Sequence, residues 1–91
     1  MYRIVASRRF KKQLKKIMRS GQYDAEKLQK VIQMLQKGTV LPSSYRDHAL
    51  KGDLHDYREC HIAPDWLLVY RFYEDILILE LSSTGSHSQL F

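Results

Sequence analysis

The sequence has 91 residues, 44% of them hydrophobic, and a formal net charge of +5 at pH 7, which suits one small domain over residues 1–91. Cys60 is the only cysteine, which excludes a disulfide scaffold and a zinc-binding cysteine pair. The longest apolar runs, WLLVY and ILIL, have the length of strands, so neither predicts a membrane span. We therefore expect a soluble, cytoplasmic protein that is held together by packing.

The N-terminal segment predicts a strand followed by a strongly basic helix. MYRIV, residues 1–5, alternates as a short strand, and Ser7 suits the N-cap of a helix over about residues 8–20. Residues 1–22 carry eight Lys or Arg and no acidic residue. Because like charges without a compensating Glu repel each other, we expect this helix to bind nucleic acid or another polyanion, with a merely solvated helix face as the alternative. The residues that we assign to phosphate contact are Lys11, Lys12, Lys15, Lys16 and Arg19.

A second helix and four strands are predicted for the rest of the chain. Asp24 suits the N-cap of a helix over about residues 25–37, and a period of two follows after the loop GTVLPSSY. The predicted strands are DHAL (47–50), DYRECHI (56–62), WLLVYRFY (66–73) and DILILELS (75–82). Helices grouped ahead of antiparallel strands indicate an α+β fold, in which an N-terminal strand and a two-helix hairpin pack on one face of a small antiparallel sheet.

The stretch HIAPDW, residues 61–66, is a candidate reactive corner. Alternation along DYRECHI directs His61 away from the core positions Cys60 and Ile62. The turn at Pro64 brings His61 and Asp65 to the same end of the sheet. Each of these residues also has a structural explanation, since a strand histidine is usually a surface residue and an aspartate often makes a turn bond.

Two further histidines and two aromatic residues complete the candidate site. His48 precedes the hairpin, and His87 lies in the polar tail STGSHSQLF, which ends in Phe91. Histidine takes and gives protons near neutral pH, and aromatic rings such as those of Trp66 and Phe91 stack on bases of single-stranded RNA. These residue types near a basic helix are suited to RNA cleavage.

Three blocks of the sequence resemble a known family. DHALKG, YRECHIAPDWLLVY and TGSHSQLF are similar, in the same order and spacing, to the signature blocks of the YafQ branch of the RelE/ParE toxin superfamily. The segments FKKQLKK and VIQMLQKG fit its helical half, so the resemblance covers essentially the whole chain. It implies a RelE-like fold, the cleavage residues His48, His61, Asp65 and His87, and the aromatic helpers Trp66 and Phe91. His55 matches no functional position.

The resemblance implies the toxin of a bacterial type II toxin–antitoxin pair, an endoribonuclease that cleaves mRNA in the ribosomal A site. No metal or cofactor is expected, because RNA supplies its own 2′-OH as the nucleophile and leaves a 2′,3′-cyclic phosphate. We expect His87 to be the general acid, and His48, His61 and Asp65 to share the base and orienting roles. Charge on the transition state would be offset by Arg58, Arg71 or Lys51.

The resemblance also implies two kinds of macromolecular partner and no membrane. The basic helix would attach the protein to ribosomal RNA through phosphate contacts that carry no sequence information. A cognate antitoxin, acidic, partly disordered until bound and encoded by a neighbouring gene, would bind the toxin.

Three alternatives from other classes stay open at this point. A ParE-like toxin of the same superfamily would inhibit DNA gyrase and cleave nothing. A non-catalytic RNA-binding module would bind RNA without a cyclic-phosphate product. A zinc site built from His48, His61, Asp65 and His87 would use acceptable ligand types, although their spacing contains no compact ligand pair.

Overall fold

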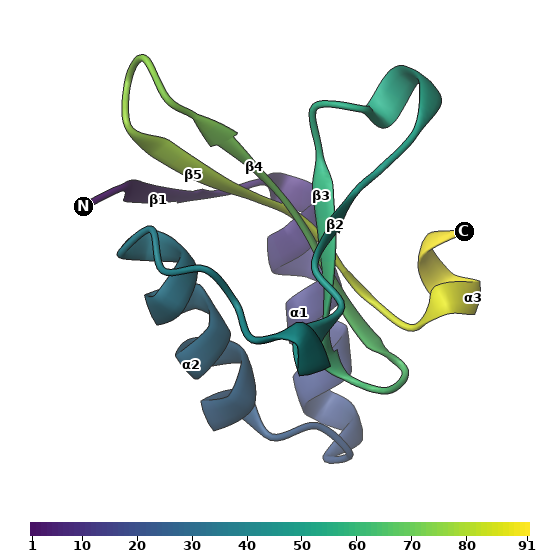
Figure 1. Cartoon of the computed structure of the whole chain (residues 1–91). Coiled ribbons are helices and arrows are strands. Elements are labelled where there is room, and N and C mark those ends of the chain that lie inside the picture. Colours follow the sequence, from purple (N-terminus) through teal and green to yellow (C-terminus); the bar gives the residue numbers. More distant parts are fainter.

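Five strands form one sheet in the computed structural model, which describes residues 1–91 (Figure 1). The strands are β1 (Arg3–Ala6), β2 (His48–Ala49), β3 (Arg58–Ala63), β4 (Trp66–Tyr73) and β5 (Ile78–Gly85), and their order across the sheet is β1-β5-β4-β3-β2. Neighbouring strands are antiparallel except β1, which runs parallel to β5. Parallel neighbours need a long connection, and here most of the chain lies between them. The predicted α+β fold is confirmed, with β1 as its one parallel strand.

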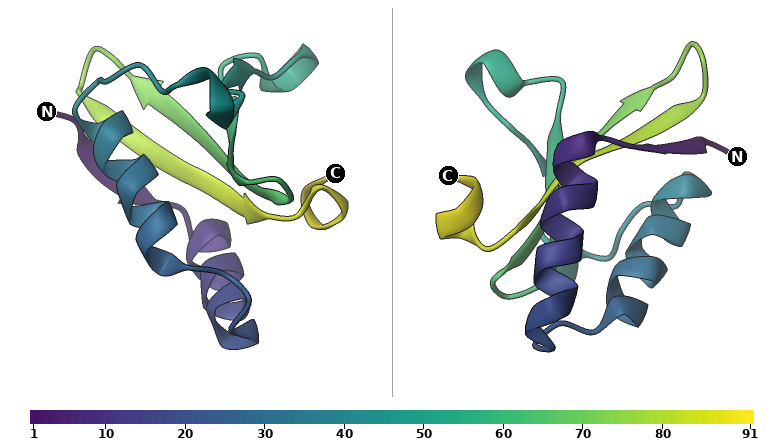
Figure 2. Two further views of the ribbon diagram at one scale, coloured as in Figure 1. Left: turned by 60° about the horizontal axis from the view of Figure 1, so that its bottom comes forward. Right: turned by 180° about the vertical axis from the view of Figure 1, so that it is seen from behind.

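Two helices, α1 and α2, cover the same side of the sheet (Figure 2). The helical elements are α1 (Arg8–Ser20), α2 (Ala25–Gln36), α3 (His87–Leu90) and the 3₁₀ turns η1 (Ser43–Tyr45) and η2 (Gly52–Leu54). Both predicted N-caps are confirmed, because Ser7 accepts a hydrogen bond from the Phe10 amide and Asp24 accepts one from the Glu26 amide. None of the helices combines the length and the apolar character that crossing a membrane requires.

The core lies between these two helices and the facing side of the sheet. Its members include Phe10, Leu28, Val31, Leu35, Cys60, Ile62, Trp66, Leu68, Tyr70, Leu79 and Leu81, all buried. The helical residues recur at intervals of three or four and the strand residues at intervals of two, so both periodicities point into the same core. The histidines of the candidate site are absent from this cluster.

Only β4 has its predicted bounds: β1 and β3 are displaced by one or two residues, and β2 and β5 differ more clearly. β2 contains only two residues, because η1 precedes it and a turn leads to η2 after it. β5 begins at Ile78, since residues 74–77 form the turn of the hairpin, and it continues to Gly85. Thr84 belongs to the predicted polar tail but is buried, which is tolerated because its hydroxyl accepts a hydrogen bond from Trp66 Nε1 and donates one to the Leu67 carbonyl.

Candidate active site

The sheet has two chemically different faces. The helix face carries Cys60, Ile62, Trp66, Leu68 and Tyr70 and packs on α1 and α2. The opposite face, here called the reactive face, carries His48, Glu59, His61, Leu67 and Val69. The strand register produces this grouping, since His48 is paired with Glu59, Glu59 with Val69, and His61 with Leu67. Directly paired residues direct their side chains to the same side of a sheet.

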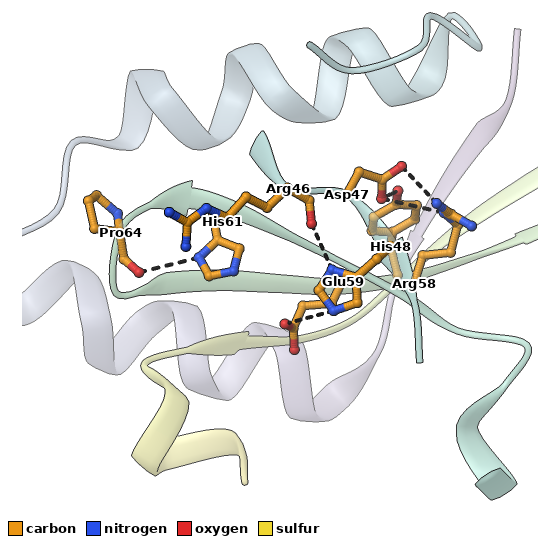
Figure 3. A network of polar contacts seen from close by, with 8 residues as sticks. Arg46, Asp47, His48, Arg58, Glu59, His61 and Pro64 are labelled. Atoms are coloured by element: carbon orange, nitrogen blue, oxygen red, sulfur yellow. Dashed lines mark hydrogen bonds and ion pairs between the residues drawn. The ribbon is translucent and has the colours of Figure 1, made fainter. Parts of the chain in front are cut away.

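His48 is held between a backbone carbonyl and a buried carboxylate (Figure 3). Its Nδ1 lies 2.7 Å from the Arg46 carbonyl oxygen, and its Nε2 lies 3.4 Å from Glu59 Oε1. The side chain of Glu59 is 4% exposed, whereas that of His48 is 51% exposed. A carbonyl oxygen only accepts hydrogen bonds, so Nδ1 carries a proton, and Nε2 is the ring nitrogen that faces the carboxylate. The carbonyl and the carboxylate together fix the orientation of the His48 ring on the reactive face.

His61, at the β3–β4 turn, also uses Nδ1 for a backbone carbonyl, but no carboxylate faces its Nε2. Its Nδ1 lies 3.3 Å from the Pro64 carbonyl oxygen, which again requires the proton on Nδ1 (Figure 3). The lone pair of Nε2 is then directed away from the backbone. An imidazole fixed in this tautomer is suited to accept a proton from a substrate hydroxyl.

The C-terminal helix α3 brings a second imidazole to His61. The ring centroids of His61 and His87 are 6.3 Å apart, and the ring of Phe91 lies 5.8 Å from that of His87. Ser86 and Gln89 form a reciprocal capping box at the start of α3. Gly85 has φ +155°, and a Cβ there would lie 2.8 Å from Gln89 Oε1, so glycine permits the close approach of α3 to the end of β5.

Asp65 bonds to the backbone of α3 and not to an imidazole ring. Its Oδ1 accepts a hydrogen bond of 3.2 Å from the backbone amide of His87. This bond joins the turn that carries His61 to the helix that carries His87. The tail therefore closes on the HIAPDW corner, with Asp65 as the residue that ties the two segments together.

The expected substrate role of Trp66 is contradicted by its burial. Trp66 is 1% exposed, packs edge-on against Tyr23 with ring centroids 4.9 Å apart, and donates its Nε1 proton to Thr84. The first residue of β4 points to the helix face because it alternates with Leu67. A ring enclosed in this way cannot stack on a base, so Trp66 is a core residue beneath the site.

Arg58 is also displaced from the role expected for it. Alternation directs it to the helix side of β3, where it forms an ion pair with Asp47 at 3.1 Å (Figure 3). The hydroxyl of Tyr70 donates to the same carboxylate. Burial, and then the bond to Asp47, raise the pKa of Tyr70 well above its ordinary value, and the bond to Asp47 raises the pKa of Arg58. Arg58 therefore anchors Asp47, the residue before His48, and does not face the phosphate.

The remaining expected cations occupy three different places. Arg71 lies on the reactive face, 5.5 Å from the centroid of the Tyr57 ring and 4.4 Å from that of Tyr73. Lys51 is exposed at the start of η2. The five residues of α1 that we assigned to phosphate contact are all exposed, namely Lys11, Lys12, Lys15, Lys16 and Arg19.

The residues of the zinc alternative do not form a metal site in this structure. No group of three or more His, Cys, Asp and Glu side chains is arranged to hold a metal ion. Asp65 directs an oxygen to the His87 amide, and His48 is turned to Glu59. The four side chains thus have separate hydrogen-bonding partners.

Sequence reasoning missed two residues that orient His48. Alternation already placed Glu59 on the side of His61, but the two-residue pairing of β2 with β3 was needed to bring it to His48. Asp47 gave no signal in the sequence, because its partners Arg58 and Tyr70 lie 11 and 23 residues away.

Comparison with known proteins assigns the family. Residues 2–91 match a family described as a bacterial toxin of type II toxin–antitoxin systems, YafQ. The mRNA interferase toxin YafQ of Escherichia coli (strain K12) is 36% identical over 77 residues, which are 84% of this chain and 82% of that protein. A metal-bound toxin from Helicobacter pylori superposes with a TM-score of 0.90 at 44% identity, with 100% of both chains covered. YafQ in the E. coli DinJ-YafQ complex has a TM-score of 0.87 at 32% identity, with 100% of this chain and 99% of that chain covered. The chain therefore belongs to the YafQ family of bacterial toxins from type II toxin–antitoxin systems.

Proposed function

We propose that this toxin is an mRNA interferase that cleaves mRNA in the ribosomal A site by acid–base catalysis from the reactive face. Membership of the YafQ family supports endoribonuclease activity. The observation that carries the mechanism is the approach of two imidazoles from distant segments, with His61 and His87 rings 6.3 Å apart. Two imidazoles this close can both contact one phosphodiester of a bound RNA.

His61 acts as the general base and His87 as the general acid. His61 Nε2 takes the proton of the 2′-OH, and the O2′ atom forms a bond to the adjacent phosphorus. The bond from phosphorus to O5′ breaks, and His87 gives a proton to the departing O5′. The products are a 2′,3′-cyclic phosphate and a 5′-hydroxyl, and the two histidines end in exchanged protonation states. Positioned proton transfer of this kind contributes typically about 10²–10⁴-fold to the rate.

His48 has a supporting role at the phosphate. Its two ring nitrogens face a carbonyl and a carboxylate, so its ring is held in one orientation. In its protonated form the ring would stabilise charge that develops on the phosphorane-like transition state. Asp65 acts through α3, because its bond to the His87 amide sets the distance between acid and base.

The proposed partners are the ribosome and a cognate antitoxin. The exposed basic residues of α1 support contact with ribosomal RNA through phosphates. A complex with DinJ is known for the E. coli relative, and an acidic antitoxin from a neighbouring gene suits the net charge of +5 of this chain.

The test compares two histidine variants in a translation reaction. His87→Ala should lower the rate of mRNA cleavage by about 10²-fold or more, because the leaving oxygen loses its acid. His55→Ala is the matched control, since His55 lies next to η2, 72% exposed and paired with Asp56. Mapping of the 5′ ends and detection of the cyclic phosphate provide the measurement. Parent toxin that left mRNA intact but blocked gyrase supercoiling would overturn the proposal.

A further inference from the structure

A cavity of about 210 Å³ lies between the reactive face and the C-terminal segment. Its lining includes Arg9, Leu54, Tyr57, Val69, Ser83 and Phe91. Val69 and Ser83 are paired across β4 and β5, and Val69 is paired with Glu59 on its other side. One row across the sheet therefore runs from His48 through Glu59 to the base of the cavity.

Phe91 connects the cavity to His87, one of the two proposed catalytic histidines. Phe91 lines the cavity, and its ring also lies 5.8 Å from that of His87. A nucleotide whose phosphate lies between His61 and His87 therefore has its neighbouring base within reach of the cavity.

The size and lining of the cavity suit one flat aromatic ring. Its volume is below the range of about 300–1,000 Å³ that drug-sized ligands occupy, and it accommodates a single nucleobase. Phe91 is 61% exposed and Leu54 is 46% exposed, so both have apolar surface that a base would cover. Base stacking on aromatic side chains is the usual way in which proteins bind unpaired RNA bases.

Tyr57 is held in place before any ligand arrives. The guanidinium of Arg71 lies 5.5 Å from the centroid of its ring, and Arg71 is itself within 3.8 Å of Asp56. A ring fixed in this way loses little conformational freedom when a base stacks on it. Arg9, at the start of α1, adds a positive charge at the rim, in a first helical turn that contains no acidic residue.

We propose that this cavity binds one nucleobase next to the scissile phosphate and thereby contributes to the sequence preference of cleavage. Tyr57 and Phe91 provide the stacking surfaces, Val69 forms the floor, and Arg9 contacts a flanking phosphate. This inference rests on the proposed function, since it assumes that RNA is bound on the reactive face. It adds a specificity-determining site to the catalytic residues.

Binding is tested with short 2′-O-methyl oligoribonucleotides, which cannot be cleaved because they lack the nucleophile. Amide signals of Leu54, Tyr57 and Phe91 in ¹⁵N-labelled toxin should shift on titration, to an extent that depends on the base. An oligonucleotide with one abasic position should lose these shifts and keep those of α1. Identical shifts with the abasic oligonucleotide would overturn the proposal.

Variants separate this site from catalysis. Tyr57→Ala should weaken oligonucleotide binding about 5- to 150-fold, the range for loss of one stacked base, and Tyr57→Phe should restore it. Leu54→Ala is a milder second variant, and Ile76→Ala is its control because Ile76 is 60% exposed in the β4–β5 turn. In the translation reaction, the base frequency at one position beside the cut should change for Tyr57→Ala but not for Ile76→Ala.

The two proposals fail in different ways. Parent toxin that cleaves no mRNA contradicts the proposed function. Parent toxin that cleaves, with the same cut sites and oligonucleotide affinity in Tyr57→Ala and Leu54→Ala, contradicts the base site alone. Loss of antitoxin binding in these variants, with unchanged oligonucleotide binding, would also overturn it, because the cavity would then receive a protein side chain.

Discussion

The two faces of the same central strands differ in how completely their polar groups are enclosed. On the helix face, Trp66 and Tyr70 are at most 1% exposed, and each donates its polar hydrogen to a fixed partner. On the reactive face, the rings of His48 and His61 each use Nδ1 for a backbone carbonyl and keep Nε2 toward a carboxylate or the open surface. The helix face thus holds most of the core and the reactive face holds the histidines, so mutations on the two faces should affect stability and proton transfer to different extents.

The largest effect is expected from Trp66→Ala. This change removes a fully buried ring together with its contact to Tyr23, and should lower the free energy of unfolding by about 3–5 kcal/mol. Chemical denaturation followed by circular dichroism measures the decrease. A small domain has only about 5–15 kcal/mol in total, so this loss is a large part of its stability, and cleavage should decrease in proportion to the unfolded fraction.

Trp66→Phe tests whether the ring has any direct part in cleavage. Phenylalanine keeps most of the packing, and Thr84 still donates to the Leu67 carbonyl after the indole bond is removed. We expect the rate of cleavage per folded molecule to remain within about threefold of the parent, a change of less than about 1 kcal/mol. A folded Trp66→Phe toxin with no cleavage would place the ring back in the substrate site.

Asp47→Asn should lower the free energy of unfolding less than Trp66→Ala does. It removes the carboxylate that links Arg58 and Tyr70 on the helix face to the residue before His48. Asp47 accepts hydrogen bonds from Arg58 and Tyr70 on the helix side, and it directly precedes His48. Because Arg58 is 40% exposed and partly screened, the free energy of unfolding should fall by only about 1–3 kcal/mol. Cleavage should fall as well, since the two-residue strand β2 loses its anchor.

Asp75→Asn is the matched control for this variant. Asp75 is exposed in the β4–β5 turn and forms no ion pair, so its replacement should change stability by less than about 0.5 kcal/mol. An equal decrease of cleavage in both variants would contradict a specific role for Asp47 in positioning His48.

Sequence periodicity predicted the helix face better than the reactive face for a physical reason. Apolar spacing reports burial, so the inward positions of α1, α2, β3 and β4 could be assigned from local pattern. The same alternation separated His61 from Cys60. It could not reveal that β2 pairs with β3 for two residues, or that Asp65 bonds to the His87 amide, because these contacts join segments far apart in the chain. For Trp66, an aromatic side chain suggested base stacking, but alternation with Leu67 decides its direction and places it in the core.

Alkaline pH should destabilise the helix face through Cys60. Burial raises the pKa of its thiol from 9.0 to about 12. In the unfolded chain the thiol ionises near pH 9, whereas the folded protein retains the proton, so the unfolded state binds fewer protons as pH rises. The free energy of unfolding should therefore fall above about pH 9, by about 1.4 kcal/mol at about pH 10 from this group.

The contribution of Cys60 is measured against Cys60→Ala. Tyr70 adds to the decline only above pH 10, because burial raises its pKa from an ordinary value of 10.0. Between about pH 9 and about pH 10, denaturation midpoints of the parent should fall more steeply than those of Cys60→Ala. Parallel pH profiles would show that the thiol ionises equally in both states.

Only a small effect on stability is expected at the exposed basic surface of α1, which belongs to neither face. Lys12, Lys15 and Lys16 make no ion pair and are exposed, so replacing all three by Gln should change the free energy of unfolding by less than about 1 kcal/mol. Replacing Lys27, Lys30 and Lys37 around α2 removes the same charge and is the matched control.

If α1 contacts ribosomal RNA, only the first variant should reduce the slope of log affinity against log salt, by roughly 0.7–0.9 for each phosphate that is no longer neutralised. Equal slopes in the two variants would mean that overall charge, and not the position of α1, attracts the ribosome. Since the histidines lie across the sheet from this helix, cleavage of RNA supplied at saturating concentration should be unchanged in both.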